Sequence, residues 1–304
     1  MSDGGGLSRW DSEMGYEIST KAIAEVCGDP HFSDACRASI TRALAYIKVD
    51  PVQHSNFRDI GRMVLGTLAL YLHASGGLTH RRLGALSSGG GILSAGRATA
   101  ILLRLRAIGY VKATAKRING SARLYVPTAK MIAAFRTRVG IELAGIALME
   151  PRMNDFIALF ESDDVLFRFY RLTGERLLDA QQRRHPALAD FESIIARDAG
   201  MLTFFALFEA ADTGGDFPPA GPLKISLADL ARRFSVSRTH MLRLLRDAEK
   251  FGYVTRDAAG NYNGITTRLR DDFRLYYGII LITLTAMASG VTRELDASRR
   301  SLTA

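Results

Sequence analysis

The sequence predicts a mainly α-helical protein with short β-hairpins, arranged as two similar units along the chain. Three observations predict this class: apolar residues recur at three-to-four-residue spacing, prolines number only eight, and one pattern of helices and a hairpin occurs twice. The chain has 304 residues, enough for two domains. Its 47% hydrophobic and 23% charged residues indicate a soluble, globular protein.

The charge of the chain is concentrated in one stretch. Residues 60–141 contain thirteen Lys and Arg residues and no Asp or Glu, in a chain whose formal net charge is +9. A solvated protein surface normally mixes both signs. The one-sided charge therefore predicts a polyanionic partner, either nucleic acid or a membrane surface.

Residues 1–55 are predicted to be an N-terminal tail followed by a helix. The tail, Met1 to Tyr16, lacks the basic and apolar regions of a signal peptide. Asp29-Pro30 marks the start of the helix, which runs to about Ile47. A second helix begins at Ile60 and ends at Gly76-Gly77.

Residues 56–150 are predicted to form the first domain. A short helix, Thr79 to about Leu86, is followed by a glycine loop, Ser87 to Gly91, and by a helix that Ser94 caps. Two short strands around the turn at 118–121 then form a basic hairpin, and a long helix runs from Thr128 to about Met149. A helix, a short helix, a helix and a hairpin together make a winged helix-turn-helix.

The remaining chain is predicted to contain a helical linker, a second winged helix domain and a C-terminal tail, at 151–200, 201–292 and 293–304. Two helices make up the linker. In the second domain, Ser226 caps a short helix, Ser237 caps the next helix, and a hairpin turns at 259–261. A terminal helix begins at about Arg270.

The two domains agree in register. Ser94 and Ser237 are separated by 143 residues, and the same offset relates Gly109-Tyr110-Val111 to Gly252-Tyr253-Val254. The turn before the capped helix is four residues longer in the first domain. This agreement predicts an internal duplication.

Two segments resemble known DNA-binding families. The segment 236–245, followed by Phe251-Gly252-Tyr253-Val254, resembles the helix-turn-helix of Crp/Fnr-type regulators. The first domain, with its longer basic wing and the long helix after it, is similar to a MarR-type winged helix. Both resemblances imply a DNA-binding transcriptional regulator.

The expected DNA contacts follow from the geometry of the fold. An α-helix fits the major groove, where the exposed residues of its N-terminal half reach base edges, and basic residues on a wing meet phosphates or the minor groove. The predicted DNA-binding residues are Arg81, Arg82, Ser94, Arg97, Thr99, Arg104, Lys112, Lys116, Arg117, Arg123, Ser237, Arg238, Thr239, His240, Arg243 and Arg256.

No catalytic residues, metal ligands or cofactor are predicted, so the chain is not expected to be an enzyme. His73 and His80 are seven residues apart without a third ligand nearby. Cys27 and Cys36, the only cysteines, are interpreted as ordinary helix residues in a reducing compartment. The 18 uncharged residues 275–292 are expected to form a buried helix in the core or in a subunit interface, not a membrane span.

The sequence therefore predicts a cytoplasmic, nucleoid-associated regulator that binds double-stranded DNA and no membrane. Its two domains are expected either to act as a built-in pseudo-dimer, on half-sites roughly 34 Å apart, or to belong to a homodimer. A plasmid-type replication initiator and a chromosome-segregation subunit, which also contain tandem winged helices, are the alternatives. The acid-free stretch 60–141 of the first domain argues against the segregation subunit.

Overall fold

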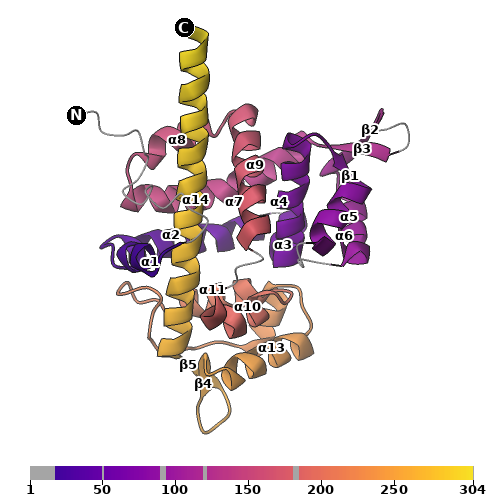
Figure 1. The fold of residues 1–304 in the computed structure, drawn as a ribbon. Coiled ribbons are helices and arrows are strands. Elements are labelled where there is room, and N and C mark those ends of the chain that lie inside the picture. The colour runs from indigo at the N-terminus through magenta and orange to yellow at the C-terminus, as the bar shows by residue number, and fades with distance from the viewer. Residues whose placement is uncertain (1–17, 50, 90–93, 119–121, 181–184, 304) are drawn as a thin grey trace, which may run out of the picture. The chain divides into compact units, whose positions relative to one another are not determined.

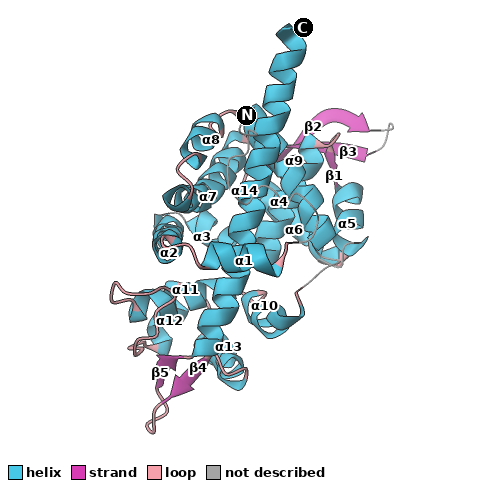
Figure 2. Cartoon of the chain, turned by 60° about the vertical axis from the view of Figure 1, so that its left-hand side comes forward, coloured by secondary structure: helices cyan, strands magenta, loops and turns pink. Residues whose placement is uncertain are grey.

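The structure is a computed structural model that describes residues 18–49, 51–89, 94–118, 122–180 and 185–303. It is mainly helical, with a three-stranded and a two-stranded antiparallel sheet among these residues (Figures 1 and 2). The predicted class, mainly α with short hairpins, is confirmed. The chain divides into two compact units that are each discontinuous in sequence.

The first unit contains most of the acid-free stretch. Of the described residues, it includes 18–22, those between 61 and 180, and 281–303. Its elements are α4 (Ile60–Ala74), β1 (Leu78–Thr79), α5 (His80–Gly89), α6 (Ala95–Ala107), β2 (Val111–Ile118), β3 (Ala122–Pro127), α7 (Ala129–Met149), α8 (Met153–Leu159), α9 (Asp163–Ala180) and the last part of α14 (Thr267–Thr303). The sheet order is β1-β3-β2.

Close helix packing forms the core of the first unit. A Cβ atom on Gly66 of α4 would lie 2.2 Å from the ring of Phe135 on α7, so only glycine permits this approach. The hydroxyl of buried Tyr170, on α9, donates to the carbonyl oxygen of Phe135 at 3.0 Å, and their rings pack edge to face. Phe156 of α8 and Phe169 and Tyr170 of α9 are buried core residues of this unit.

The second unit combines the N-terminal helices with the later part of the chain. Its elements are most of α1 (Thr20–Cys27), α2 (Phe32–Val49), α3 (Pro51–Phe57), the 3₁₀ helix η2 (Pro186–Leu188), α10 (Ala189–Ile195), α11 (Gly200–Ala211), α12 (Leu227–Arg233), α13 (Arg238–Lys250), β4 (Val254–Arg256), β5 (Tyr262–Ile265) and the first part of α14. β4 and β5 form its antiparallel hairpin.

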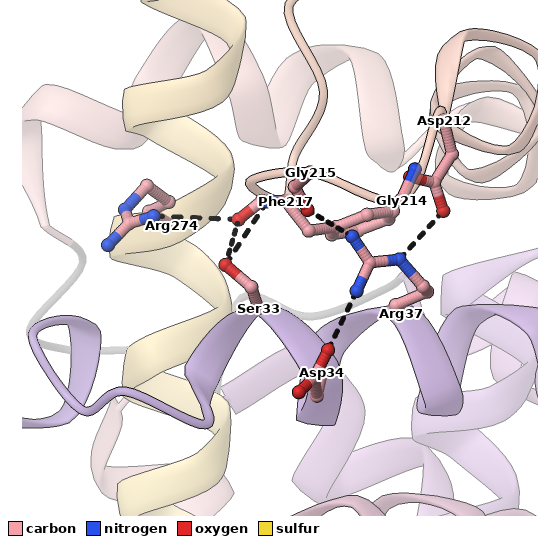
Figure 3. Close-up of polar contacts among 8 residues, drawn as sticks. All are labelled: Ser33, Asp34, Arg37, Asp212, Gly214, Gly215, Phe217 and Arg274. Carbon is pink, nitrogen blue, oxygen red and sulfur yellow. Dashed lines mark hydrogen bonds and ion pairs between the residues drawn. The ribbon is translucent and has the colours of Figure 1, made fainter.

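An arginine on α2 fixes the long loop between α11 and α12 (Figure 3). The Arg37 guanidinium pairs with Asp212 Oδ2 at 2.8 Å and with Asp34 Oδ1 at 2.8 Å, and it also donates to the carbonyl oxygen of Gly215. The hydroxyl of Ser33 accepts from the backbone N–H of Phe217 at 3.1 Å. The N-terminal helix α2 is thus built into the second unit.

The order of elements recurs in the two units. The first has α4, β1, α5, α6, the β2–β3 hairpin and α7; the second has α11, α12, α13, the β4–β5 hairpin and α14. In the first unit, β1 pairs with β3. At the corresponding place, the second unit has an isolated antiparallel bridge between Pro222 and Gly264 of β5.

The residues predicted to correspond in the two domains also make the same hydrogen bonds. Ser94 and Ser237 cap α6 and α13 as predicted, because their hydroxyls accept from the backbone N–H three residues later, at 3.3 and 3.1 Å. Gly109 and Gly252 end these helices at φ values of 76° and 73°, which glycine adopts without strain.

Several predicted boundaries were wrong. Ser87 to Gly89, expected in a loop, continue α5, because the Ser87 and Ser88 hydroxyls donate to the carbonyl oxygens of Leu83 and Gly84 within the helix. Residues 90–91 of that predicted loop, and 119–121 of the predicted hairpin turn, lie outside the described residues. The final helix α14 begins at Thr267, before Arg270, and extends to Thr303, so most of the predicted tail is helical.

The stretch 151–200 also differs from the two predicted helices. It contains α8, α9, η2 and α10, with a break at 160–162 between the first two. Asp163 and Asp164 lie in the first turn of α9, where acidic side chains favour a new helix start. Residues 153–180 belong to the first unit and 185–200 to the second, so the compact units follow other boundaries than the predicted domains.

One helix, α14, is long and apolar enough to cross a membrane by length and composition. Its apolar window is 44% buried within the structure. Leu281, Ala288 and Val291 are among its fully buried residues. A core helix meets the same length criterion, and this burial is consistent with the expected core position.

Candidate nucleic-acid interface

The outward face of α6 presents the residues predicted to contact bases in the first unit. Ala98, Ile101, Leu102 and Leu105 are buried and attach α6 to the core. On the other side, Ser94 and Arg97 are exposed, while Arg104, in the last turn, is partly exposed. Arg97 and Arg104 are seven residues apart and therefore lie on one flank of the helix.

The hairpin β2–β3 carries a cluster of exposed basic residues. Lys112, Lys116, Arg117 and Arg123 are all exposed. Arg117 stands directly opposite Arg123 in the antiparallel register. Like charges in this arrangement repel, and a bound anion would relieve the repulsion. The register of the two strands shifts between Ala113 and Arg117, and there the Thr114 hydroxyl lies 3.2 Å from the carbonyl oxygen of Lys116.

The basic residues of the stretch 60–141 differ in their contacts. Several have side-chain partners within the protein: Arg82 and Lys130 donate to backbone carbonyls, Arg136 to Asp163, and Arg138 to Glu142. Interactions are also made by Arg62, Arg97, Arg104 and Arg117. The remaining five have no side-chain hydrogen bond or ion pair with the described residues: Arg81, Arg106, Lys112, Lys116 and Arg123. These side chains are available to an external anion.

Arg82 has a defined role inside the fold. Its guanidinium donates to the carbonyl oxygens of Gly77 at 2.7 Å and Ser75 at 3.0 Å, in the turn that follows α4. Gly76 and Gly77 both have positive φ in this turn. The neighbouring Arg81 points to solvent instead.

A polar contact connects the first turn of α5 with the second turn of α6. Nε2 of His80 lies 2.6 Å from the hydroxyl oxygen of Thr99, and that hydroxyl also lies 2.9 Å from the carbonyl oxygen of Ala95. The hydroxyl of Thr99, a predicted DNA contact, thus has intramolecular partners.

In the second unit, some predicted DNA-contact residues are exposed, and others form hydrogen bonds or ion pairs within the unit. Arg238, Thr239 and Arg243 on α13 are exposed. Nε2 of His240 lies 2.8 Å from the carbonyl oxygen of Asp198. Arg256 pairs with Glu249 at 2.6 Å and donates to the hydroxyl of Tyr262.

A further arginine, Arg58, braces the turn between α12 and α13. It pairs with Asp198 at 2.8 Å and donates to the carbonyl oxygens of Phe234 and Ser235 at 3.0 and 2.9 Å. Ser235 has a φ of 52°, in the left-handed region that non-glycine residues rarely adopt. This brace joins residues far apart in sequence, so local sequence patterns did not predict it.

The sequence interpretation omitted Arg106, Arg246 and Lys250, which are also exposed on these two helices. On α13, three-to-four-residue spacing places four residues on one helix face: Thr239, Arg243, Arg246 and Lys250. This spacing is visible in the sequence and could have identified Arg246 and Lys250. Just after α13, burial raises the pKa of Tyr253 above its usual range, and its hydrogen bond to Asp272 acts in the same direction.

Within the described ranges, no group of three or more His, Cys, Asp or Glu residues could hold a metal ion. Both cysteines are free thiols, and Cys36 is fully buried. Burial raises the pKa of the Cys27 thiol, which opposes formation of the reactive thiolate.

Comparison with known proteins gives no family. No family model, no curated protein and no solved structure matches the chain. The candidate interface is therefore described by its geometry and charge alone.

Proposed function

We propose that the chain is a sequence-specific, double-stranded-DNA-binding transcriptional regulator with two winged helix domains. One observation carries the proposal: a capped, outward-facing helix and a basic hairpin lie in a stretch without a single acidic residue. The recurring order of elements and the matching caps of α6 and α13 support two copies of one DNA-binding fold.

In this proposal, α6 enters the major groove and the β2–β3 hairpin rests on the backbone or in the minor groove. Arg97 and Arg104 approach base edges, where an arginine that bonds bidentately to guanine contributes about 1–3 kcal/mol of discrimination. Lys112, Lys116 and Arg123 contact phosphates, which raises affinity without selecting sequence. In the second domain, Arg238, Thr239 and Arg243 take the corresponding place.

Two double variants test these separate roles. Replacing Arg97 and Arg104 with alanine should weaken binding to a selected site and relax its sequence preference. Replacing Lys116 and Arg117 with alanine should lower affinity for all duplexes and flatten the salt dependence. Gel-shift titrations against a selected and a scrambled duplex measure both effects. Parental binding by both variants would exclude the first domain as the DNA-binding element.

A plasmid-type replication initiator is the second candidate, because two units with the same order of elements also suit a protein that binds repeated sites at an origin. Footprinting combined with mass measurement of the complex addresses the assembly. One chain that protects two half-sites supports the pseudo-dimer, and two chains on two copies of one half-site support the homodimer. Mapping of bound chromosomal and plasmid sites separates a regulator from an initiator.

A further inference from the structure

The outward faces of α6 and α13 differ in chemistry at corresponding positions. The offset of 143 residues that relates the two helix caps also relates four exposed positions along these faces. In α6 they are Gly96, Ala100, Leu103 and Ala107, and in α13 they are Thr239, Arg243, Arg246 and Lys250. The middle of the α6 face is therefore apolar, whereas the middle of the α13 face is mainly basic.

The flanks of the two helices differ in the opposite sense. Arg104 of α6 corresponds to Asp247 of α13, which pairs with Arg197 at 2.5 Å. Arg97 corresponds to His240, whose Nε2 lies 2.8 Å from a backbone carbonyl oxygen. Basic side chains thus border an apolar strip on α6, whereas on α13 they form the strip itself.

Leu103 lies at the centre of the α6 face with basic residues on both sides. It is 56% exposed. Helical geometry places Arg97 and Arg104 to one side of it and Arg106 to the other. A single exposed leucine is ordinary on a protein surface, so the charged border is the informative feature. A DNA duplex has the complementary pattern, because phosphates line both rims of the major groove and base edges form its floor.

The base edges of the major groove suit the two faces differently. Their apolar group is the C5-methyl group of thymine, whereas guanine presents two acceptors, O6 and N7. Leucine cannot donate a hydrogen bond, so the methyl group is its match, while an arginine can donate to both guanine acceptors. Arg243 and Arg246 are exposed and have no side-chain hydrogen bond or ion pair with the described residues.

We infer that the two helices read different bases. Leu103 of α6 packs against a thymine methyl group, and Arg243 and Arg246 of α13 bond to guanines. This inference rests on the proposed function and names the bases that the same interface selects. The hairpins fit this division, because β2–β3 has several exposed basic residues for phosphates, whereas the one basic residue of residues 254–265, Arg256, pairs with Glu249 at 2.6 Å.

The test uses base analogues in a duplex that the full chain selects from a random library, with anisotropy titration at fixed salt. Replacing single thymines with uracil removes only the methyl group and should weaken parental binding about fourfold at one or more positions. Leu103→Ala should bind the unmodified duplex at least about fourfold less tightly and lose nothing further with uracil there. Leu148→Ala, which truncates an exposed leucine on α7, is the matched control and should behave like the parent.

Guanine analogues test α13 in the same way. Replacing a contacted guanine with 7-deazaguanine removes the N7 acceptor and should cost the parent and Leu103→Ala about fivefold. Arg243→Ala or Arg246→Ala should abolish this cost at the guanine that each residue contacts and leave the cost of uracil unchanged. A double variant that copies the second unit, A100R/L103R, should lose the sensitivity to uracil. Far-UV circular dichroism checks the fold of each variant.

The outcomes that overturn the inference and the proposed function are distinct. If uracil costs the parent nothing, or costs Leu103→Ala as much as the parent, Leu103 does not read thymine. If 7-deazaguanine costs the parent and the arginine variants equally, α13 does not read guanine; in both cases the proposed function stands. A DNA-free mass that falls in Leu103→Ala but not in Leu148→Ala would assign Leu103 to an interface between copies of the chain instead. If the parent binds and selects no duplex, the proposed function itself is wrong.

Discussion

Two adjacent arginines illustrate how residues of one type take different roles. Arg81 is exposed and has no partner among the described residues, whereas Arg82 donates to the carbonyl oxygens of Gly77 and Ser75. Those carbonyls follow the end of α4, where helices leave backbone acceptors unsatisfied. Both were predicted as DNA contacts because a sequence shows charge but not the direction of a side chain.

Alanine substitutions of this pair should have opposite effects. Arg82→Ala removes two charge-assisted hydrogen bonds and should lower the free energy of unfolding by about 1–3 kcal/mol, with unchanged DNA affinity of the folded protein. Arg81→Ala should leave stability unchanged and reduce affinity at low salt. Urea denaturation and anisotropy titration measure the two properties. A loss of affinity in a stably folded Arg82→Ala variant would contradict this assignment.

His73 gives the first unit a pH-dependent stability. It packs edge to face on Phe167, and burial lowers its pKa below the ordinary value of 6.5. The unfolded state therefore binds the proton more readily, so this contribution to stability is present above about pH 6.5 and is lost as the pH falls through the lowered pKa. In urea denaturation between pH 7.5 and 5.5, His73→Gln should show a smaller loss of stability than the parent. An identical pH slope in both proteins would exclude this role for His73.

At the scale of elements, each hairpin is joined to the following helix by a threonine in the same way. The Thr128 hydroxyl lies 2.6 Å from the carbonyl oxygen of Gly109, and the Thr266 hydroxyl lies 2.7 Å from that of Gly252. Each hydroxyl also accepts from a backbone N–H in the first turn of α7 or α14. Each threonine thus connects the end of one helix to the start of the next.

Loss of either threonine should destabilise the unit to which it belongs. Thr128→Ala and Thr266→Ala should each cost about 1 kcal/mol, as expected for a lost helix cap, while Thr→Ser at the same positions should cost much less because the hydroxyl remains. Hydrogen–deuterium exchange should show faster exchange in β2 and α7 for the first variant, and in β4 and the start of α14 for the second. Equal exchange in alanine and serine variants would contradict the capping role.

The sequence predicted these elements well where the signal is local. The caps at Ser94, Ser226 and Ser237 and the start of α7 after Thr128 were confirmed, because a cap depends on one side chain and the next three residues. The predicted end of α5 was wrong. Glycine and serine favour loops in general, but here the hydroxyls of Ser87 and Ser88 bond to carbonyl oxygens within the helix.

At the scale of the whole molecule, less could be predicted from the sequence. The two compact units are discontinuous, and the second includes both α2 and the loop that Arg37 fixes to it. Arg37 and Asp212 are 175 residues apart, and no local periodicity indicates that they pair. The contacts of Arg58 and His240 with Asp198 were not predicted for the same reason. The basic stretch itself was evident from composition.

The salt dependence of duplex binding by the full chain tests the central claim most directly. Five basic residues of the first unit, Arg81, Arg106, Lys112, Lys116 and Arg123, have no partner among the described residues. If each meets one phosphate, the logarithm of the binding constant should fall linearly with the logarithm of the salt concentration, with a slope of about −4.5. A binding constant that does not change with salt, or no binding at low salt, would contradict the claim that this surface binds DNA.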